Sequence, residues 1–511
     1  MPRGWLTTPS SLVTAAMLLL LLTHGPLVAH GHSGHTGKET SHDIDTTLWL
    51  HVVFMGLAYG VIFPVGTVLG IVKHKLHVPL QAVGVCLVVV GYFLGHFHQG
   101  RHFGESAHVS FSRFVLLALG LQAGCGIYLK LHLERRFKRD PLRPFIKPIH
   151  RYLGLLTTLV AWVQVLLGFI AMSGFCYADH FGQCLAHFIM GSSFVWYGVW
   201  MLFSLTLAGS WLRSKGRSPE FYDSVAILAW GIFNTFTEHR WNEAWTHKDL
   251  QHTAMGILWW AGGLVGVVMT WRTSPDSRSM IPSLIILFTG LAMGAHHQHT
   301  EFSTKIHAFF GGSLTIAGVT RIIELVLLTQ PRPHRPTAPG ASLDPPIQPF
   351  QYIPVFFLML SGTMFMSANE ESLHTLMDWG ADPASYALLI VSVAFMLFFV
   401  ALSLINLYKR LREPQLNLGQ YQVVGVNDLA PPYGPTDHPH SGAHFPYEPR
   451  HSHSPYPPDA AEAYTQTIFD IASRSSLEDD DPQSAVILRE ELEMSPVGRA
   501  PQRPRLSEAE K

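Results

Sequence analysis

Eleven stretches of this chain are each long and apolar enough to cross a lipid bilayer as a helix. A bilayer interior offers no hydrogen-bond partner for an open backbone, so such stretches fold as helices. They predict an all-α, polytopic membrane protein embedded in the lipid bilayer, with its spans in two bundles. The stretches are residues 48–72, 78–97, 111–131, 152–174, 186–212, 221–238, 252–271, 281–298, 306–328, 349–368 and 384–408.

The composition of the 511-residue chain argues against two other classes of protein. Only 14% of the residues are charged, whereas soluble proteins carry about a quarter. The formal net charge of −1 gives no electrostatic reason to expect nucleic-acid binding. Histidine is the unusual residue, with 30 copies, and it binds metal ions and haem iron. The placement of the histidines is therefore the main guide to function.

The N-terminus predicts a secretory signal peptide over residues 1–29, with Arg3 before a short apolar run and Ala29 at the cleavage position. An uncleaved signal anchor is the alternative. Both place the His-rich segment 30–47 on the lumenal or outer side. With that start, the predicted inner loops hold 21 Lys and Arg and the outer loops hold 6. This excess is what the positive-inside rule requires.

The C-terminal region, residues 411–511, is rich in proline, histidine, serine and acidic residues and has no apolar periodicity. Such a composition predicts a disordered tail, and an odd number of spans places it in the cytosol. The signal peptide and the spans together predict a membrane of the secretory pathway. This could be the endoplasmic reticulum, the Golgi, the vacuole or the plasma membrane.

Four histidines lie at helix ends in the predicted N-terminal bundle, residues 48–175. His51 and His108 lie at the outer ends of the first and third spans. His77 and His150 lie at the inner ends of the second and fourth spans. Two such pairs could each ligate a haem between facing helices, while interfacial histidines without a ligand are the alternative. Gly154, one turn after His150, would clear space beside the ligand.

The motifs around these histidines resemble the cytochrome b561 core over residues 45–175. The motifs are the run from His51 to Gly66, His77-x3-Gln81, His108-x13-Gln122 and His150-x3-Gly154. Members of that family hold two b-type haems between transmembrane helices and pass electrons across the membrane. The resemblance implies one haem between His51 and His108 on the outer side. It implies a second haem between His77 and His150 on the inner side.

The chain before the tail also resembles the Ytp-type fungal transmembrane proteins. The likeness rests on the signal peptide, the cytochrome-like region, a His-rich second set of spans over residues 186–410, and the polar tail. That family has no firmly assigned activity, so the resemblance implies an architecture more than a function.

Histidines and carboxylates also gather at the outer ends of the later spans. Imidazole and carboxylate groups that converge at one membrane face could hold zinc, iron or copper. A solvated, His-rich rim without a bound ion is the alternative. The predicted metal ligands are Glu238, His239, His252, His296, His297, His299, Glu301 and His307.

Two further features belong to the outer side. Cys176 and Cys184 share one outer loop, where an oxidising lumen favours a disulfide. A histidine one turn before a glycine also recurs at the start of three later spans, which indicates an old duplication or close helix packing. The three repeats are His187-x3-Gly191, His252-x3-Gly256 and His307-x3-Gly311.

The leading functional hypothesis is a haem-dependent transmembrane electron carrier, which makes an oxidoreductase the candidate enzyme class. It would take electrons from a cytosolic donor and reduce metal ions on the outer side. Basic residues near the inner pair could attract an anionic donor such as ascorbate, or could only fix the topology. The alternative is a non-haem metal transporter or metal-dependent membrane enzyme centred on the outer cluster. A scaffold with neither cofactor is the third hypothesis. The inner basic residues are Lys73, Lys75, Lys147 and Arg151.

Overall fold

The computed structural model describes most of the chain between residues 45 and 427. The described ranges are 45–99, 106–132, 142–176, 181–237, 239, 244–274, 277–296, 298–328 and 347–427. The predicted signal peptide, nearly all of the segment 30–47, and the tail beyond residue 427 lie outside them.

The described residues are helical throughout their regular structure, as the sequence predicts, and each of the eleven predicted stretches holds a helix. Nine of the described helices are long and apolar enough to cross a membrane. The helices of the other two predicted stretches do not meet this length and hydropathy. Helix α9 (Pro219–Thr237) carries Glu220 and Asp223 near its start, and α11 (Ile281–Gly294) has only 14 residues.

The first span is one continuous helix with a widened turn in its middle. Pro64 has no N–H to donate one turn back, and the ladder widens just before it into the π-helical turn η1. Asp45 starts the span by accepting a hydrogen bond from the Leu48 N–H at 2.9 Å. The N-terminal helices are α2 (Thr46–Leu57), η1 (Ala58–Ile62), α3 (Phe63–Ile71), α4 (His77–Phe97), α5 (Ala107–Lys130) and α6 (Arg143–Ser173).

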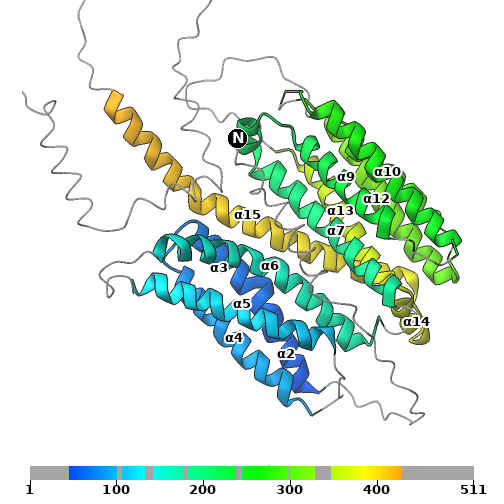
Figure 1. Ribbon diagram of the computed structural model, residues 1–511, viewed down its shortest axis with the longest axis horizontal. Helices are drawn as coiled ribbons and strands as arrows, with labels where there is room; N and C mark the ends of the chain where they lie inside the picture. The colour runs from blue at the N-terminus through cyan, green and yellow to red at the C-terminus, as the bar shows by residue number, and fades with distance from the viewer. Residues whose placement is uncertain are drawn as a thin grey trace, which may run out of the picture. The chain divides into compact units, whose positions relative to one another are not determined.

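These N-terminal helices pack as two pairs (Figure 1). The first span packs along α4, and α5 packs along α6. Two small apolar clusters, which share Tyr59, lie between the pairs. From 11% to 28% of each of these spans is buried, against 33% to 61% for α7, α10, α12 and α13. The N-terminal helices are therefore packed less tightly against one another than most of the later spans.

The later helices form a denser bundle. Helix α7 packs against α13, α9 against α10, and α11 against α12, while α14 is a short amphipathic helix. The main apolar core of the described chain lies here, around Phe310, Leu314 and Met364. The helices are α7 (Phe181–Thr206), α8 (Gly209–Lys215), α9, α10 (His247–Thr270), α11, α12 (Glu301–Leu327), α13 (Tyr352–Ser367), α14 (Glu370–Asp378) and α15 (Pro383–Asn427).

The glycines of the His-x3-Gly repeats are used for close helix packing. A Cβ on Gly191 would lie 2.5 Å from the Gly362 carbonyl oxygen, and one on Gly311 would lie 2.4 Å from the Gly294 nitrogen. A Cβ on Gly256 would lie 2.5 Å from the Thr235 hydroxyl oxygen. Small residues that let backbones approach are the usual means of packing helices in membranes.

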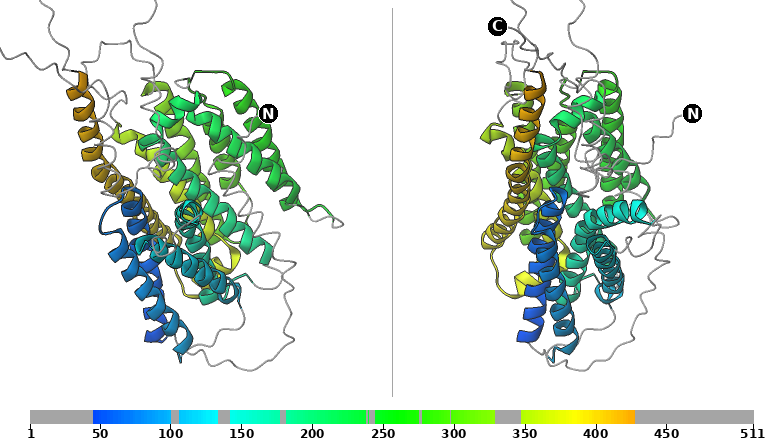
Figure 2. Two further views of the ribbon diagram at one scale, coloured as in Figure 1. Left: turned by 60° about the vertical axis from the view of Figure 1, so that its left-hand side comes forward. Right: turned by 90° about the vertical axis from the view of Figure 1, so that its left-hand side faces the viewer.

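Helix α15 connects the two groups of spans. It packs along α13 and also contacts α3, as the gold and blue helices in Figure 2 show. The Trp162 indole of α6 donates a hydrogen bond of 3.0 Å to Ser192 of α7. Because α15 continues to Asn427, the first part of the predicted tail, residues 411–427, is helical.

Candidate functional site

The structure brings together the two histidine pairs that the sequence predicts. The rings of His51 on α2 and His108 on α5 have their centroids 6.4 Å apart. The rings of His77 on α4 and His150 on α6 have theirs 6.3 Å apart. In each pair one histidine comes from the α2–α4 side of the bundle and the other from the α5–α6 side. Each pair therefore bridges the two loosely packed helix pairs.

The separation of the rings suits two axial ligands on one metal atom. An imidazole nitrogen binds a metal at about 2 Å, so two such nitrogens on opposite sides lie about 4 Å apart. Each ring centre lies about 1 Å behind its nitrogen, so the two centres should be about 6 Å apart. The distances of 6.4 and 6.3 Å agree with that value. The residues present thus fit bis-histidine ligation.

Each of the four imidazoles is oriented by a backbone carbonyl of a neighbouring helical segment. The Nδ1 atoms of His51 and His77 lie 2.7 and 2.8 Å from the carbonyl oxygens of Gly91 and Gly66. Those of His108 and His150 lie 3.3 and 3.2 Å from the carbonyl oxygens of Gln164 and Gln122. A carbonyl only accepts, so Nδ1 of His51, His77 and His150 carries the proton and donates. Nε2 is then the atom with a lone pair for a metal. At His108 the Gln164 amide nitrogen, a donor, also lies 3.0 Å from Nδ1.

Glycines on the neighbouring segments make room for the four rings. A Cβ on Gly95 would lie 2.6 Å from the His51 ring, and one on Gly70 would lie 2.8 Å from the His77 ring. Gly168 and Gly126 have the same role beside His108 and His150, at 3.0 and 3.2 Å. Gly154, which the sequence suggested for this purpose, instead lies against the Gln122 side chain. Three of these glycines lie more than 20 residues from their histidines in sequence, and Gly70 lies on the helix before His77, so the His-x3-Gly spacing did not find them.

Two glutamines, Gln122 of α5 and Gln164 of α6, lie near the histidine pairs. Fourteen residues of helix span about 21 Å, so in the antiparallel helices α5 and α6 each glutamine lies at the depth of the partner helix's histidine. The Gln164 amide donates to the His108 carbonyl at 3.1 Å, and the Gln122 side chain lines a small cavity of about 30 Å³ with Tyr59 and Thr157. The side-chain oxygens of both glutamines are buried and have no hydrogen-bond partner among the described residues. Buried acceptors of this kind mark a place where a further group or water is expected.

The predicted outer metal ligands that the structure describes lie in separate places, because other side chains and the helix packing hold them apart. His239 stacks on Trp245 at 3.9 Å and faces Asp249, while His252 stacks on His296 at 5.7 Å. The other described ligands also have partners elsewhere or are exposed. His307 faces His187 at 6.2 Å, Glu301 pairs with Lys305 at 2.7 Å, and His299 is exposed.

Within the described ranges, only one group of three or more His, Cys, Asp or Glu residues has its ligand atoms within 4.8 Å of one another. It consists of Cys176, Cys184 and Glu371, and its two sulfurs are already joined in a disulfide. Two of the predicted ligands, Glu238 and His297, lie outside the described residues. A shared outer metal centre stays a prediction.

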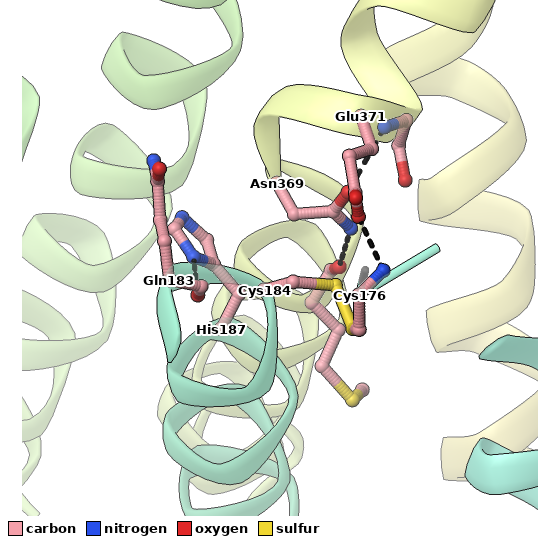
Figure 3. Close-up of a disulfide and its surroundings, with 8 residues drawn as sticks. Cys176, Gln183, Cys184, His187, Asn369 and Glu371 are labelled. Atoms are coloured by element: carbon pink, nitrogen blue, oxygen red, sulfur yellow. Dashed lines mark hydrogen bonds between the residues drawn. A yellow bond between two sulfur atoms is a disulfide. The ribbon is translucent and has the colours of Figure 1, made fainter. Parts of the chain in front are cut away.

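The disulfide between Cys176 and Cys184 joins the end of α6 to the start of α7, as the sequence predicts (Figure 3). The Glu371 carboxylate of α14 accepts a hydrogen bond from the Cys176 N–H. Cys176 has a φ of 65°, which a residue other than glycine seldom adopts. The disulfide and Glu371 together hold Cys176 between the start of α7 and α14.

A buried network of charged side chains was missed by the sequence reasoning. Glu220, Asp223 and Glu324 are all buried, and two of them form ion pairs with Arg321. Arg278 also pairs with Glu220. Charged residues in otherwise apolar helices usually mark a functional site. Glu220, Arg278, Arg321 and Glu324 fall in the predicted inner loops, so the sequence pattern offered no reason to expect them in the interior.

The fold and these contacts define a polytopic α-helical integral membrane protein with two facing histidine pairs in its N-terminal bundle. Residues 160–409 match the family described as "Protein YTP1-like, C-terminal". Residues 32–132 match a domain of unknown function, DUF2427. Three of the four paired histidines lie in the DUF2427 match, and His150 lies between the two matched regions.

Three relatives show the extent of the similarity. Protein YTP1 of Saccharomyces cerevisiae is 42% identical over 58% of this chain and 62% of its own length. An uncharacterized membrane protein of Schizosaccharomyces pombe is 24% identical over 63% of this chain and 86% of its own. Another uncharacterized membrane protein of S. cerevisiae is 29% identical over 36% of this chain and 30% of its own. The chain thus spans less than two thirds of the YTP1 protein, and no solved structure matches it.

Proposed function

We propose that the N-terminal bundle binds two b-type haems and carries electrons across a membrane of the secretory pathway. The observation that carries this proposal is the separation of 6.4 and 6.3 Å in the two histidine pairs, one near each end of the bundle. A bound haem would supply one-electron redox chemistry. The resemblance to cytochrome b561 is a prediction that agrees with this geometry.

The protein's own residues would bind, orient and insulate the cofactors. The carbonyl bonds at Nδ1 fix each ring and make Nε2 a better ligand. The apolar clusters around Phe63, Val88 and Val160 lie between the two helix pairs and would keep water from the middle of the bundle. Low local polarity of this kind is one of the means by which a protein sets a haem's potential.

The direction of transfer follows from the predicted topology. Lys73 and Lys75 lie in the turn before His77, and Arg151 directly follows His150. This positive charge favours an anionic donor, such as ascorbate, in the cytosol. The outer pair would then pass electrons to an oxidised metal ion on the lumenal or outer side. The enzyme class proposed is accordingly a transmembrane oxidoreductase.

An absorption spectrum of the purified full-length protein, oxidised and then reduced with dithionite, tests the proposal. We expect sharp visible bands on reduction and two haems per chain by haemochrome assay. His51→Ala and His150→Ala should each leave one haem, because each removes a ligand from a different pair. His96→Ala is the matched control, since the His96 ring packs against Tyr92 of its own helix. A colourless wild-type protein, or full haem content in both variants, would contradict the proposal.

The second candidate is a non-haem metal transporter or metal-dependent membrane enzyme. The paired rings of His187 with His307 and of His252 with His296 favour it, since they place imidazoles together in the later bundle. Elemental analysis of the same preparation distinguishes the two functions. Stoichiometric zinc, iron or copper in a colourless protein would support the second, whereas two haems and no other metal would support the first.

A further inference from the structure

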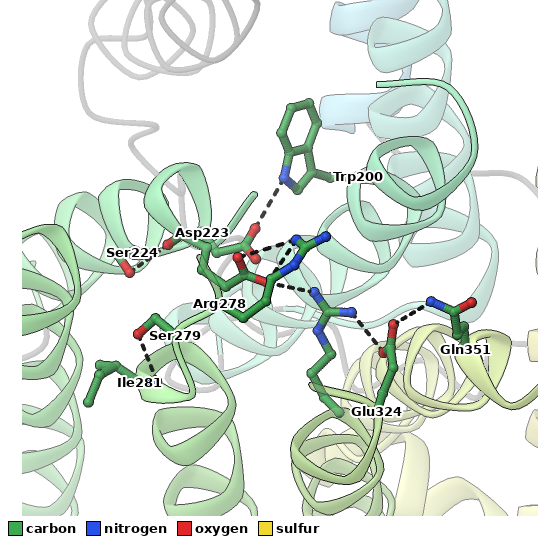
Figure 4. Close-up of polar contacts among 10 residues, drawn as sticks. Trp200, Asp223, Ser224, Arg278, Ser279, Ile281, Glu324 and Gln351 are labelled. Atoms are coloured by element: carbon green, nitrogen blue, oxygen red, sulfur yellow. Dashed lines mark hydrogen bonds and ion pairs between the residues drawn. The ribbon is translucent and has the colours of Figure 1, made fainter. Parts of the chain in front are cut away.

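A network of five charged side chains lies inside the later bundle, near Trp200 of α7. Figure 4 shows polar contacts of this network. Arg321 connects two carboxylates, lying 3.0 Å from Glu220 and 2.7 Å from Glu324. Arg278 approaches Glu220 at 3.4 Å from the loop before α11. Gln351 donates a further hydrogen bond to Glu324 at 3.0 Å. Glu220 and Glu324 are thus both compensated by guanidinium groups.

The fifth member, Asp223, has no such compensation. It is buried, one turn from Glu220 on α9, and no guanidinium or ammonium group in the described ranges lies within 4.0 Å of it. Its hydrogen-bond partner is a neutral group, because the Trp200 indole donates to it at 3.2 Å. The Tyr197 hydroxyl, also neutral, faces it from α7. A buried ionised carboxylate whose hydrogen-bond partners are all neutral is costly.

The charge count leads to the same residue. Three ionised carboxylates against two guanidinium groups would leave one net negative charge where water is largely excluded. One bound proton removes that charge. Of the three carboxylates, only Asp223 lacks an ion pair, so the proton is held there at the least cost.

We propose that Asp223 is a proton-binding site, protonated while the network is intact and able to release its proton to the aqueous phase. The release would start at a small cavity of about 10 Å³, lined by Asp223 together with Tyr197, Glu220, Ser283 and Arg321. The groups that face it come from every helix packed around it. The ionisable ones are Tyr197 of α7, Glu220 of α9, Arg278 of the loop before α11, and Arg321 and Glu324 of α12; α11 and α13 add neutral residues to the cavity.

Infrared difference spectroscopy of the full-length protein in lipid bilayers tests the proposal directly. The carbonyl stretch of a protonated carboxyl should be present at neutral pH and absent from Asp223→Asn. It should disappear as the pH rises, with the protonated fraction falling about tenfold for each pH unit above the midpoint. Trp200→Phe should move that midpoint upward, because it removes a donor that favours the ionised form. A spectrum without this band, or one unaltered by Asp223→Asn, overturns the proposal.

A stability comparison gives an independent check. An amide mimics a protonated carboxyl, so Asp223→Asn should keep the wild-type thermal midpoint. Glu220→Gln should lower it, because Arg278 and Arg321 both lose their shared carboxylate. Equal destabilisation by the two changes would mean that Asp223 is needed as an anion, contrary to the proposal. Neither measurement depends on haem, so the result is separate from that of the proposed electron transfer.

Discussion

At the scale of single residues, the candidate haem ligands depend on the glycines behind them as much as on the histidines. Gly95 and Gly70 approach the rings of His51 and His77 so closely that an added Cβ would overlap them. Each ring is therefore held between a glycine surface and a backbone carbonyl. These contacts leave little freedom for the ring to turn, which is how a ligand is preorganised.

Replacing one of these glycines should remove one haem site and spare the other. Gly95→Val should displace the His51 ring and leave one haem per chain, while Gly70→Val should do the same at the inner pair. Haem stoichiometry and a redox titration of each variant provide the measurement. Gly312→Val is the matched control, since a Cβ at Gly312 of α12 meets nothing within 4 Å. Unchanged haem content in the first two variants would mean that the rings are not placed by these glycines.

At the scale of helices, long apolar stretches predicted the location of every major helix, but short amphipathic helices were not found. Helix α14 lies in what the sequence suggested was an outer loop, because its nine residues include four acidic or polar groups at its start and end. One local and one long-range contact stabilise this helix. Asn369 caps its start, and Glu371 accepts a hydrogen bond from the backbone of Cys176. No local pattern in the sequence encodes a contact across 195 residues.

The disulfide beside α14 should stabilise the later bundle. Changing Cys176 and Cys184 to serine should cost about 2–4 kcal/mol, as is usual when a native disulfide is removed. We expect a lower thermal midpoint without reductant, and reduced wild-type protein should unfold at the same lower temperature. Cys86→Ser and Cys125→Ser are the controls, because both are free thiols in the described structure. If the midpoint is unchanged by reduction, the loop is held by Glu371 and the apolar core alone.

At the scale of the whole molecule, the site could be predicted because sidedness and sequence order together fix which histidines can meet. Alternating spans place His51 with His108 and His77 with His150, and the structure pairs the same residues. The buried network around Asp223 could not be found in the same way. Arg278 and Arg321 were counted among the basic residues of the predicted inner loops. Only the packing of α7, α9 and α12 shows that the Arg321 side chain lies in the interior of the later bundle.

The topology itself gives the last prediction, which concerns the side of the membrane that each end of the bundle faces. The excess of Lys and Arg in alternate loops places the end of α8 in the cytosol and the start of α12 on the lumenal side. In protein with Cys86 and Cys125 changed to serine, Lys215→Cys and Lys305→Cys report on these two ends, and both positions are exposed. In sealed vesicles with the cytosolic face outward, an impermeant maleimide should label Lys215→Cys at once. Lys305→Cys should react only after detergent is added, whereas the reverse order would invert the topology and place the inner haem pair at the lumen.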